Sequence, residues 1–147
     1  MDDLSKFSEV LDSLMFEREL NATQLAMAVG TDPTNIMRYL RCTRTPSVET
    51  LVKLADYFGC TTDYLLGRES ENYPTTFYPL PPFSEQLKVL KEHFKCPWWQ
   101  IYKTAHITSS RFYEWKNGTF SPKLVNIILL ADGFGCTVDF IIGRTKM

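Results

Sequence analysis

Apolar residues recur three or four positions apart in a series of short segments, and this spacing is typical of amphipathic helices. Leu4, Phe7, Leu11 and Leu14 predict a first helix that ends at about Arg18. No segment alternates apolar and polar residues between hairpin turns, so strands are not expected. The pattern therefore predicts an all-α fold.

Capping residues predict where the second helix begins and ends. Asn21 can cap a helix that has Gln24 three residues later, which is the pairing of a capping box. Gly30 can end this helix in a left-handed conformation. Asp32-Pro33 then combines an N-cap with a proline at the first helical position. Only residues 30–32 separate the two helices, which requires a sharp turn between them.

The third helix is predicted from Pro33 to about Arg41, with Ile36 and Leu40 facing inward at i, i+4 spacing. Two further helices follow, each with a capping hydroxyl and a closing glycine: Ser47–Gly59 and Thr61–Gly67.

The sequence contains two copies of this helical pattern. Residues 7–68 align with residues 83–144 without a gap, at an offset of 76 (83 − 7), and 18 of the 62 aligned pairs are identical. The densest match pairs LADYFGCTTDYLLGR with LADGFGCTVDFIIGR. Each repeat has the size of a small domain that can fold alone. The predicted organisation has two tandem five-helix domains and a linker: residues 1–68, 69–82 and 83–147.

The segment between the repeats, ESENYPTTFYPLPP, holds four of the eight prolines of the chain. Such a segment favours a stiff, extended polyproline-like conformation over a helix or a strand. Its fourteen residues (82 − 68) reach about 43 Å at roughly 3.1 Å per residue. The distance between successive major-groove faces of duplex DNA is ~34 Å, so the linker allows the repeats to bind adjacent half-sites.

The first repeat resembles a known DNA-binding family. The residues that carry the resemblance share one register: Leu25-Ala26, Gly30, Ile36, Pro46, Leu54-Ala55, Gly59 and the ending Asp63-Tyr64-Leu65-Leu66-Gly67. In this register they are similar to the DNA-binding domain of the Cro and phage-repressor family, also called the XRE family. The resemblance covers all of repeat one and, more loosely, repeat two. It implies a lambda-repressor-like helix-turn-helix fold, used twice.

The resemblance also implies how repeat one contacts double-stranded DNA. In that family the third helix enters the major groove, and the start of helix two and the loop after helix three bind phosphates. The implied base-reading positions are Pro33, Thr34, Asn35 and Arg38. The implied phosphate-side positions are Ala22, Arg41, Thr43 and Arg44. Arginine suits guanine and asparagine suits adenine. The alternative is that the three arginines form an ordinary solvated face.

Repeat one departs from the family pattern at two places. Met15 and Leu40 stand where the family often has a buried Arg–Glu pair, and an apolar pair there can be as stable because no charge is desolvated. Ala22 stands where the family frequently has a phosphate-binding glutamine, so one expected contact is missing.

Repeat two departs further from the pattern. Glu114 aligns with Arg38, and an acidic side chain there repels phosphate or accepts a hydrogen bond from cytosine. The remaining candidates for DNA contact in repeat two lie on or beside its third helix: Ser109, Ser110, Arg111, Lys116, Asn117 and Lys123.

Two adjacent tryptophans, Trp98 and Trp99, follow Pro97 at the start of the second helix of repeat two. Both cannot face the core of one helix, so one of them is expected to cover a surface or to form an interface. The alternative is that they pack on the linker aromatics Tyr73, Phe77 or Tyr78. The possible partners of this surface are thus the linker, repeat one, or a second copy in a homodimer.

Composition adds an asymmetry between the halves. The chain has a net charge of −1, yet residues 1–72 carry seven basic and twelve acidic residues (−5) and residues 73–147 carry nine and five (+4). The near-neutral total argues mildly against a nucleic-acid partner, and the asymmetry suggests different tasks for the halves. The longest apolar run, Ile127–Ala131, is far too short to cross a membrane, and the acidic start is unlike a secretory signal.

No cofactor or metal is expected. The four cysteines form no CxxC pair, and His93, Cys96 and His106 make only a weak zinc pattern, with Cys60 and Cys136 read as small buried residues. No catalytic residues are apparent: the histidines lack a nucleophile partner, and there is no glycine-rich phosphate loop. Three residues follow repeat two, so no ligand-sensing domain is expected after it.

The sequence therefore predicts a cytoplasmic, non-enzymatic DNA-binding protein, a transcriptional regulator that reads the major groove with the third helix of each repeat. The competing interpretation is a protein–protein interaction module with reduced or lost DNA binding, especially in repeat two.

Overall fold

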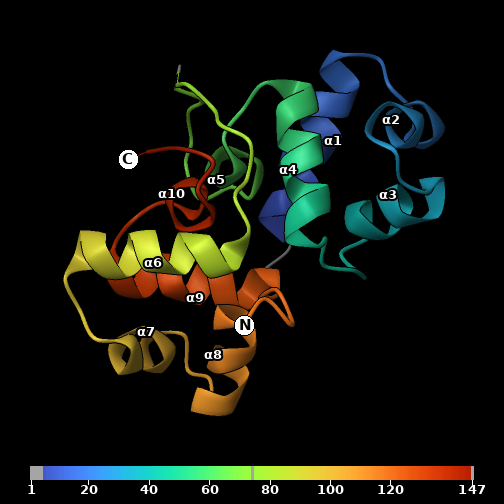
Figure 1. The fold of residues 1–147 in the computed structure, drawn as a ribbon. Coiled ribbons are helices and arrows are strands. Elements are labelled where there is room, and N and C mark those ends of the chain that lie inside the picture. Colours follow the sequence, from blue (N-terminus) through green and yellow to red (C-terminus); the bar gives the residue numbers. More distant parts are fainter. Residues whose placement is uncertain (1–4, 74, 147) are drawn as a thin grey trace. The chain divides into compact units, whose positions relative to one another are not determined.

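The computed structural model describes residues 5–73 and 75–146, and every regular element in those ranges is a helix (Figure 1). The chain divides into two compact units, residues 1–74 and 75–147, which we call unit 1 and unit 2. Each unit is described by itself. Within the described residues, no helix is long and apolar enough to cross a membrane.

Unit 1 contains five short helices around one core. They are α1 (Ser5–Glu17), α2 (Ala22–Val29), α3 (Pro33–Leu40), α4 (Val48–Phe58) and α5 (Thr62–Leu65). The side chains that are completely buried come from all five helices, among them Leu11, Leu25, Ile36, Leu54 and Leu65. Leu4, which the pattern placed on the first helix, lies outside the described residues.

The predicted caps of unit 1 are confirmed, with one exception. The Asn21 side chain accepts from the backbone N–H of Gln24 (2.8 Å), and the Gln24 side chain accepts from the N–H of Asn21 (2.9 Å), which completes the capping box. Ser47 and Thr61 cap their helices by a single bond each, accepting from the backbone N–H of Thr50 (3.1 Å) and of Tyr64 (2.9 Å). Asp32 is the exception, because its side chain makes no capping hydrogen bond although it precedes Pro33 as predicted.

The inward face of α3 differs from the prediction. Ile36 is completely buried, but the second buried position is Tyr39 (3% exposed), and Leu40 is only half-buried. The Tyr39 ring packs against Phe7 with the ring centroids 5.9 Å apart. Both i+3 and i+4 positions face the same side of a helix, so the spacing alone did not distinguish the two.

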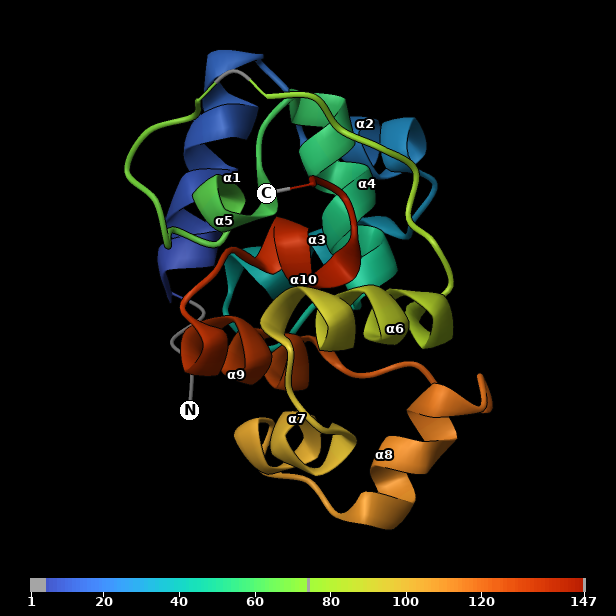
Figure 2. The same cartoon turned by 60° about the vertical axis from the view of Figure 1, so that its left-hand side comes forward.

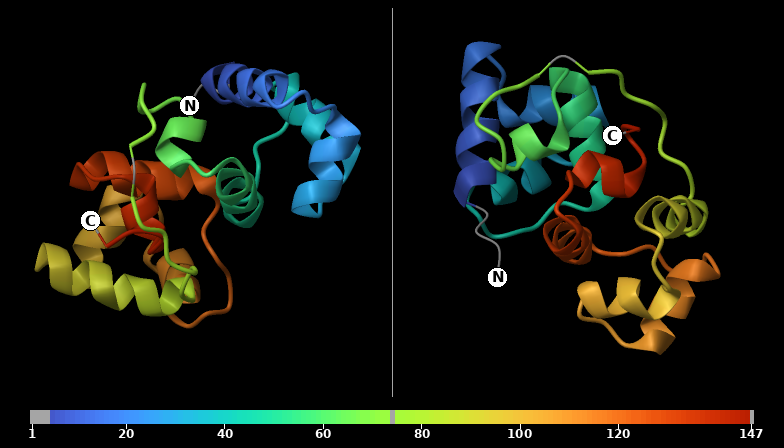
Figure 3. Two further views of the ribbon diagram at one scale, coloured as in Figure 1. Left: turned by 90° about the horizontal axis from the view of Figure 1, so that it is seen from above. Right: turned by 90° about the vertical axis from the view of Figure 1, so that its left-hand side faces the viewer.

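Unit 2 also contains five helices: α6 (Phe83–Phe94), α7 (Trp98–Thr104), α8 (Ser109–Lys116), α9 (Leu124–Phe134) and α10 (Val138–Ile142). The bounds of α8 and α9 are those of α3 and α4 moved by 76 residues (109 − 33 and 124 − 48). Figures 2 and 3 show this second set of helices from other directions. The sequence predicts a core for this repeat of six apolar residues: Leu87, Leu90, Ile101, Phe112, Leu130 and Phe134. The first five are buried, whereas Phe134 is half-buried and stacks on Phe94 (4.3 Å between centroids).

The backbone of the two units also turns at equivalent positions. Gly30 in unit 1 has φ = 75°, and His106, 76 residues later, has φ = 57° although it is not a glycine. Cys42 (φ = 61°) and Gly118 (φ = 78°) form a second such pair. Here the glycine is in unit 2 and the other residue is in unit 1. Left-handed conformations disfavour side chains, so the agreement reflects a shared chain path rather than a shared residue type.

The segment between the repeats has no helix or strand in its described residues, but both of its ends contact a unit. Near one end, the Asn72 amide donates to the carbonyl oxygen of Gly59 (3.2 Å). Near the other end, the Phe77 ring lies 3.7 Å from the Arg144 guanidinium carbon, and the backbone N–H of Tyr78 donates to the carbonyl oxygen of Arg144 (2.8 Å). The length of chain without such contacts is therefore shorter than fourteen residues.

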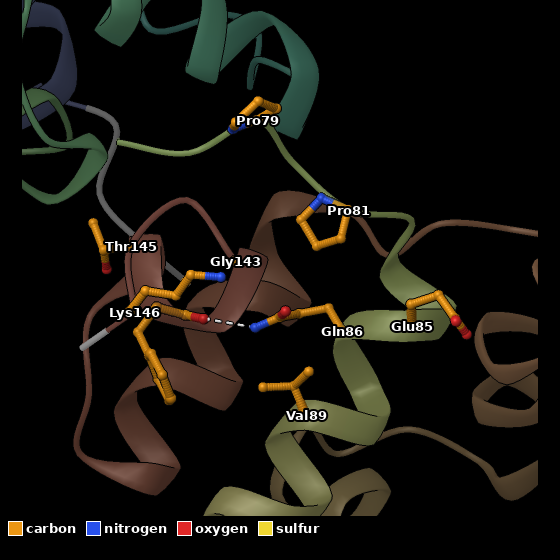
Figure 4. A pocket seen from close by; sticks show the side chains of 9 residues that line it. Pro79, Pro81, Glu85, Gln86, Val89, Gly143, Thr145 and Lys146 are labelled. Carbon is orange, nitrogen blue, oxygen red and sulfur yellow. Dashed lines mark hydrogen bonds between the residues drawn. The ribbon is translucent and has the colours of Figure 1, made fainter. Parts of the chain in front are cut away.

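The residues from Phe77 to Pro82, which we call the arm, lie over the end of unit 2. Beneath the arm, Arg144 is completely buried and its guanidinium donates to the Asp139 carboxylate (3.2 Å). A pocket of about 210 Å³ lies beside the arm, and Figure 4 shows Pro79 and Pro81 on one side of it and Gln86 and Val89 of α6 on the other. The Gln86 amide donates to the carbonyl oxygen of Phe140 at 3.0 Å, so the polar side chain on this side of the pocket is held in place by a hydrogen bond.

Cysteines and histidines occupy separate places. Cys60 is buried as predicted, but Cys136 is only half-buried. Burial raises the pKa of the Cys96 thiol above its ordinary value, and the charge of Lys91 partly offsets this. His93 packs its ring against Phe94 and Phe140, with centroids 4.8 and 4.7 Å away. Among the described residues, no three His, Cys, Asp or Glu side chains gather as a metal site would require.

Candidate nucleic-acid interface

In unit 1, α2 and α3 are joined by a turn of three residues. The N–H groups of Gly30 and Thr31 both bind the carbonyl oxygen of Ala26 (2.9 Å), which closes the end of α2. Gly30 takes the left-handed conformation that this closure requires. Two helices joined by so short a turn, seen next to each other in Figure 1, form a helix-turn-helix. Its second helix is the one that enters the major groove in proteins that bind DNA.

The outer face of α3 presents polar side chains at its first two turns. Thr34 and Arg38 are exposed, while Pro33 and Asn35 are half-buried. The Asn35 amide donates to the Thr31 hydroxyl (3.3 Å), so this side chain is oriented before any ligand binds. Thr34 and Arg38 therefore lie on the accessible side of the helix, with Asn35 at its edge.

The turn after α3 holds the remaining cationic side chains. Arg41 is exposed at the C-cap of α3, where positive charge also suits the helix dipole. Both the backbone N–H (2.9 Å) and the hydroxyl (3.2 Å) of Thr43 donate to the carbonyl oxygen of Arg38. Thr43 thus stabilises the turn, and this structural role accounts for the residue without a phosphate contact.

Arg44 is exposed and lies close enough to Tyr39 to affect its titration. Burial raises the pKa of the Tyr39 hydroxyl, while the Arg44 charge and a hydrogen bond with Thr50 partly offset this. Ala22, at the start of α2, is half-buried and has no polar side-chain atom to offer. The cationic part of this face therefore consists of Arg38, Arg41 and Arg44, with Asp32 as its acidic neighbour in the turn before α3.

The corresponding face of unit 2 is differently charged. Moving each of the three arginines by 76 residues gives Glu114, Asn117 and Phe120, so none has a basic counterpart. Arg111 on α8 forms an ion pair with Glu114 (3.2 Å between Nε and Oε1), with the two side chains 59% and 40% exposed. Ser109, Ser110, Asn117 and Lys123 are exposed, and Lys123 is the N-cap residue of α9. Sequence reasoning noted the change at Glu114 and missed the changes at Asn117 and Phe120.

Aromatic and basic side chains gather where α7 meets α8. The Lys116 ammonium lies 4.4 Å from the centre of the Trp98 ring and 5.1 Å from that of Tyr113, so it joins the two helices. Lys103 lies 5.6 Å from the centre of the Trp99 ring. We call Trp98, Trp99, Lys103, Tyr113 and Lys116 the aromatic patch. Cation–π contacts of this kind contribute about 0.5–1 kcal/mol at exposed sites.

The two tryptophans differ in burial, as their adjacency required. Trp98 is half-buried and packs within unit 2, with its ring 5.9 Å from that of Phe112, whereas Trp99 is 52% exposed. Two of the three linker aromatics have other neighbours: Phe77 lies on Arg144, and the Tyr78 ring lies 4.7 Å from the Lys146 ammonium. Trp115, which sequence reasoning left out of the core, is almost completely buried at the position equivalent to Tyr39 (39 + 76).

Comparison with known proteins agrees with the geometry of unit 1. Residues 10–71 match the family model of the Cro/C1-type HTH DNA-binding domain. The chain is also 30% identical over 66 residues to the "Cryptic phage CTXphi transcriptional repressor RstR" of Vibrio cholerae, a match that covers 45% of this chain and 60% of that protein. The chain thus spans less than two thirds of this relative's length. No solved structure matches the chain significantly. The matched family model is described as a DNA-binding domain, and the relative is described as a transcriptional repressor.

Proposed function

We propose that unit 1 binds double-stranded DNA in a sequence-specific manner and that the protein regulates transcription. In this proposal α3 enters the major groove, with Arg38 facing a guanine and Asn35 facing an adenine. Arg41 and Arg44 bind phosphates beside the end of α3, which sets the orientation of the unit on the duplex.

The observation that carries the proposal is the exposed, cationic outer face of α3 in a chain segment that matches the Cro/C1-type domain. Unit 1 has a net charge of −5, so a positively charged face on it is not a consequence of composition. A merely solvated surface in an acidic unit would carry acidic side chains among the arginines, whereas Asp32 alone among the residues from 32 to 44 is acidic.

The first experiment is selection of bound sequences from a random pool of duplex DNA. A recurring motif is expected, because base-edge contacts discriminate between sequences. With the selected duplex, Arg38→Ala should cost about 1–3 kcal/mol of binding free energy and relax the preference at one base pair. Arg44→Ala should weaken binding similarly on all sequences and lower the slope of log K against log salt by about one.

Lys88→Ala serves as the charge-matched control, since Lys88 lies on α6 and pairs with Glu85 (2.9 Å). This variant should leave both affinity and base preference unchanged. Equal, sequence-independent losses from Arg38→Ala and Arg44→Ala would remove the base-reading role of Arg38. Absence of any recurring motif would contradict sequence-specific binding altogether.

For unit 2 we propose a divergent second copy of the same domain, and two functions compete. Its α8 offers Ser109, Ser110 and Arg111 to a major groove, with Lys116, Asn117 and Lys123 near phosphates. The loss of all three basic counterparts and the exposed aromatic patch favour protein interaction instead. We therefore propose that unit 1 supplies most of the sequence preference and that unit 2 serves mainly to contact protein.

A further inference from the structure

The aromatic patch of unit 2 has the composition of a binding surface. Trp99 is 52% and Tyr113 is 45% exposed, and each has a lysine ammonium near its ring. Exposed large aromatics in a group are uncommon on surfaces that face only water. Tryptophan and tyrosine are also the residues that contribute most to binding energy at protein interfaces. The lysines add positive charge around them, so the patch fits a partner that is both apolar and acidic.

Unit 1 carries a surface of that kind on its first helix. Glu9, Asp12, Ser13 and Phe16 are spaced i, i+3, i+4 and i+7, which places them on one face of α1. All four are exposed, and Phe16 is 83% exposed, the most of any large apolar side chain in the described residues. We call these four residues the α1 stripe.

The charges around the α1 stripe are predominantly negative. Glu17 and Glu19 are exposed at the end of the helix and add to Glu9 and Asp12. The nearby Arg18 is directed elsewhere, because its guanidinium donates to two carbonyl oxygens at the end of α4 (3.1 Å each). The same asymmetry holds for the units as wholes, with −5 for unit 1 and +4 for unit 2. Complementary potentials favour and orient association.

We propose that the aromatic patch of unit 2 binds the α1 stripe of unit 1 in a second copy of this chain. The proposal rests on the assignment of unit 2 to protein interaction and names the partner. Phe16 packs among the exposed rings of the patch, and Lys103 and Lys116 face the stripe's carboxylates. The two surfaces are different, so the contact is head-to-tail: each copy offers one patch and one stripe, and longer chains of copies can form.

The α1 stripe is distinct from the outer face of α3. The arginines that are proposed to hold DNA are not part of either contact surface. Association of copies would therefore place several DNA-reading units in one assembly, and the effective concentration of each unit at neighbouring sites would rise.

The test uses two variants of the full chain, Phe16→Ser and Trp99→Ser, and sedimentation velocity without DNA. The unaltered chain should associate at low salt and dissociate as salt is raised, since exposed charges are screened. Each variant alone should associate at least about tenfold more weakly, as expected when a central aromatic contact is removed. A mixture of the two should form a one-to-one heterodimer, because the first retains an intact patch and the second an intact stripe.

Matched controls are Met27→Ser, at an 80% exposed position on α2, and Phe120→Ser, at a 58% exposed position outside the patch. Both should associate like the unaltered chain, and circular dichroism should show unchanged helix content in all four variants. The DNA proposal is tested separately, by DNA binding. Arg38→Ala, which removes a proposed base contact, is expected to associate normally.

Several outcomes would overturn the head-to-tail contact. The first is that the unaltered chain stays monomeric at low salt and high protein concentration. If Phe16→Ser associates normally and Trp99→Ser does not associate, the aromatic patches of two copies bind each other instead. Binding of a single-stranded oligonucleotide that Trp99→Ser abolishes, with no change in mass of the protein alone, would assign the patch to nucleic acid.

Discussion

Gly143 and Gly135 both have left-handed backbone conformations, with φ of 86° and 67°, but their surroundings differ. A Cβ atom on Gly135 would meet nothing within 4 Å, whereas one on Gly143 would lie 2.8 Å from the ring of Pro81 and from the Gln86 side chain. Gly135→Ala should therefore cost only the conformational penalty, about 1–2 kcal/mol of unfolding free energy. Gly143→Ala should cost a further ~1–3 kcal/mol, because a proline ring cannot move aside as a flexible chain can.

Urea unfolding of the two variants would measure this difference. Equal losses of unfolding free energy would mean that the arm does not rest on Gly143 in solution. If only Gly143→Ala lowers the free energy of unfolding, the left-handed conformation at Gly135 accommodates a side chain at a smaller cost than its φ indicates.

For single residues, the helical period predicted the buried apolar positions well. It did not predict which of two adjacent residues is the buried one. Tyr39 and Leu40 are both compatible with the helical period, and the larger ring took the buried place because its hydroxyl reaches Thr50 and the neighbourhood of Arg44. Trp115, at the equivalent position one repeat later, is also buried. Such choices depend on partners that are distant in sequence, which periodicity does not contain.

The start of α2 and the start of α3 allow a direct test of capping at the scale of an element. Asn21 takes part in both hydrogen bonds of its capping box, whereas the Asp32 side chain makes no capping bond. Asn21→Ala should lower the unfolding free energy of unit 1 by about 0.5–2 kcal/mol. Asp32→Ala should change it by much less, because no hydrogen bond to the backbone is lost.

Thermal unfolding followed by circular dichroism compares the two capping variants. Asp32 also bears the acidic charge next to α3, so its removal should slightly strengthen DNA binding while Asn21→Ala should not. A larger loss of stability from Asp32→Ala than from Asn21→Ala would contradict this account of the two helix starts.

The arm is the second element whose role can be measured. The Phe77 ring covers the buried Arg144 guanidinium at 3.7 Å, and a desolvated cation–π contact contributes about 2 kcal/mol. Phe77→Ala should therefore destabilise unit 2 by about 1–2 kcal/mol. Tyr73→Ala is the matched control, since this side chain is 57% exposed and lies in unit 1. If both variants melt like the unaltered chain, the arm is not a structural part of unit 2.

Local signals in the sequence were sufficient for the helices and insufficient for the arm. Caps, glycines and prolines act within a few residues, so the bounds of α2 to α5 followed from them. The prolines of the arm correctly indicated a segment without helix or strand. Its attachment depends on Arg144, more than sixty residues later (144 − 77 = 67), and no local pattern records that contact.

For the whole molecule, the alignment of the repeats is more informative than either repeat alone. It pairs every helix of unit 1 with one of unit 2 and shows where the surfaces differ, at the positions of Arg38, Arg41 and Arg44. The ends of the units carry equivalent ion pairs, Asp63–Arg68 (3.1 Å) and Asp139–Arg144 (3.2 Å), of which only the second is completely buried. The two units thus have the same order of helices and differ in the side chains on and beside α3 and α8.

If the changed surface is what limits DNA binding by unit 2, restoring the cations should restore it. The triple variant Glu114→Arg, Asn117→Arg and Phe120→Arg reproduces the basic pattern of unit 1 and also releases Arg111 from its ion pair. Each new phosphate contact adds about 0.9 to the slope of log K against log salt, so a steeper slope by up to about 2.7 and tighter binding are expected. Fluorescence anisotropy with a labelled duplex at several salt concentrations measures both.

The matched control must add the same charge elsewhere on unit 2. Glu85→Arg together with Glu92→Arg changes the charge by +4, as the triple variant does, but at exposed positions on α6. A general electrostatic attraction would strengthen binding equally in both variants and would contradict a specific role for the surface beside α8. A steeper slope in the triple variant alone, with a longer sequence selected from random DNA, would show that unit 2 retains the scaffold of a DNA reader. The arginines would then be what distinguishes it from unit 1, because the backbone of the turn around Cys42 in unit 1 is already matched at Gly118 in unit 2.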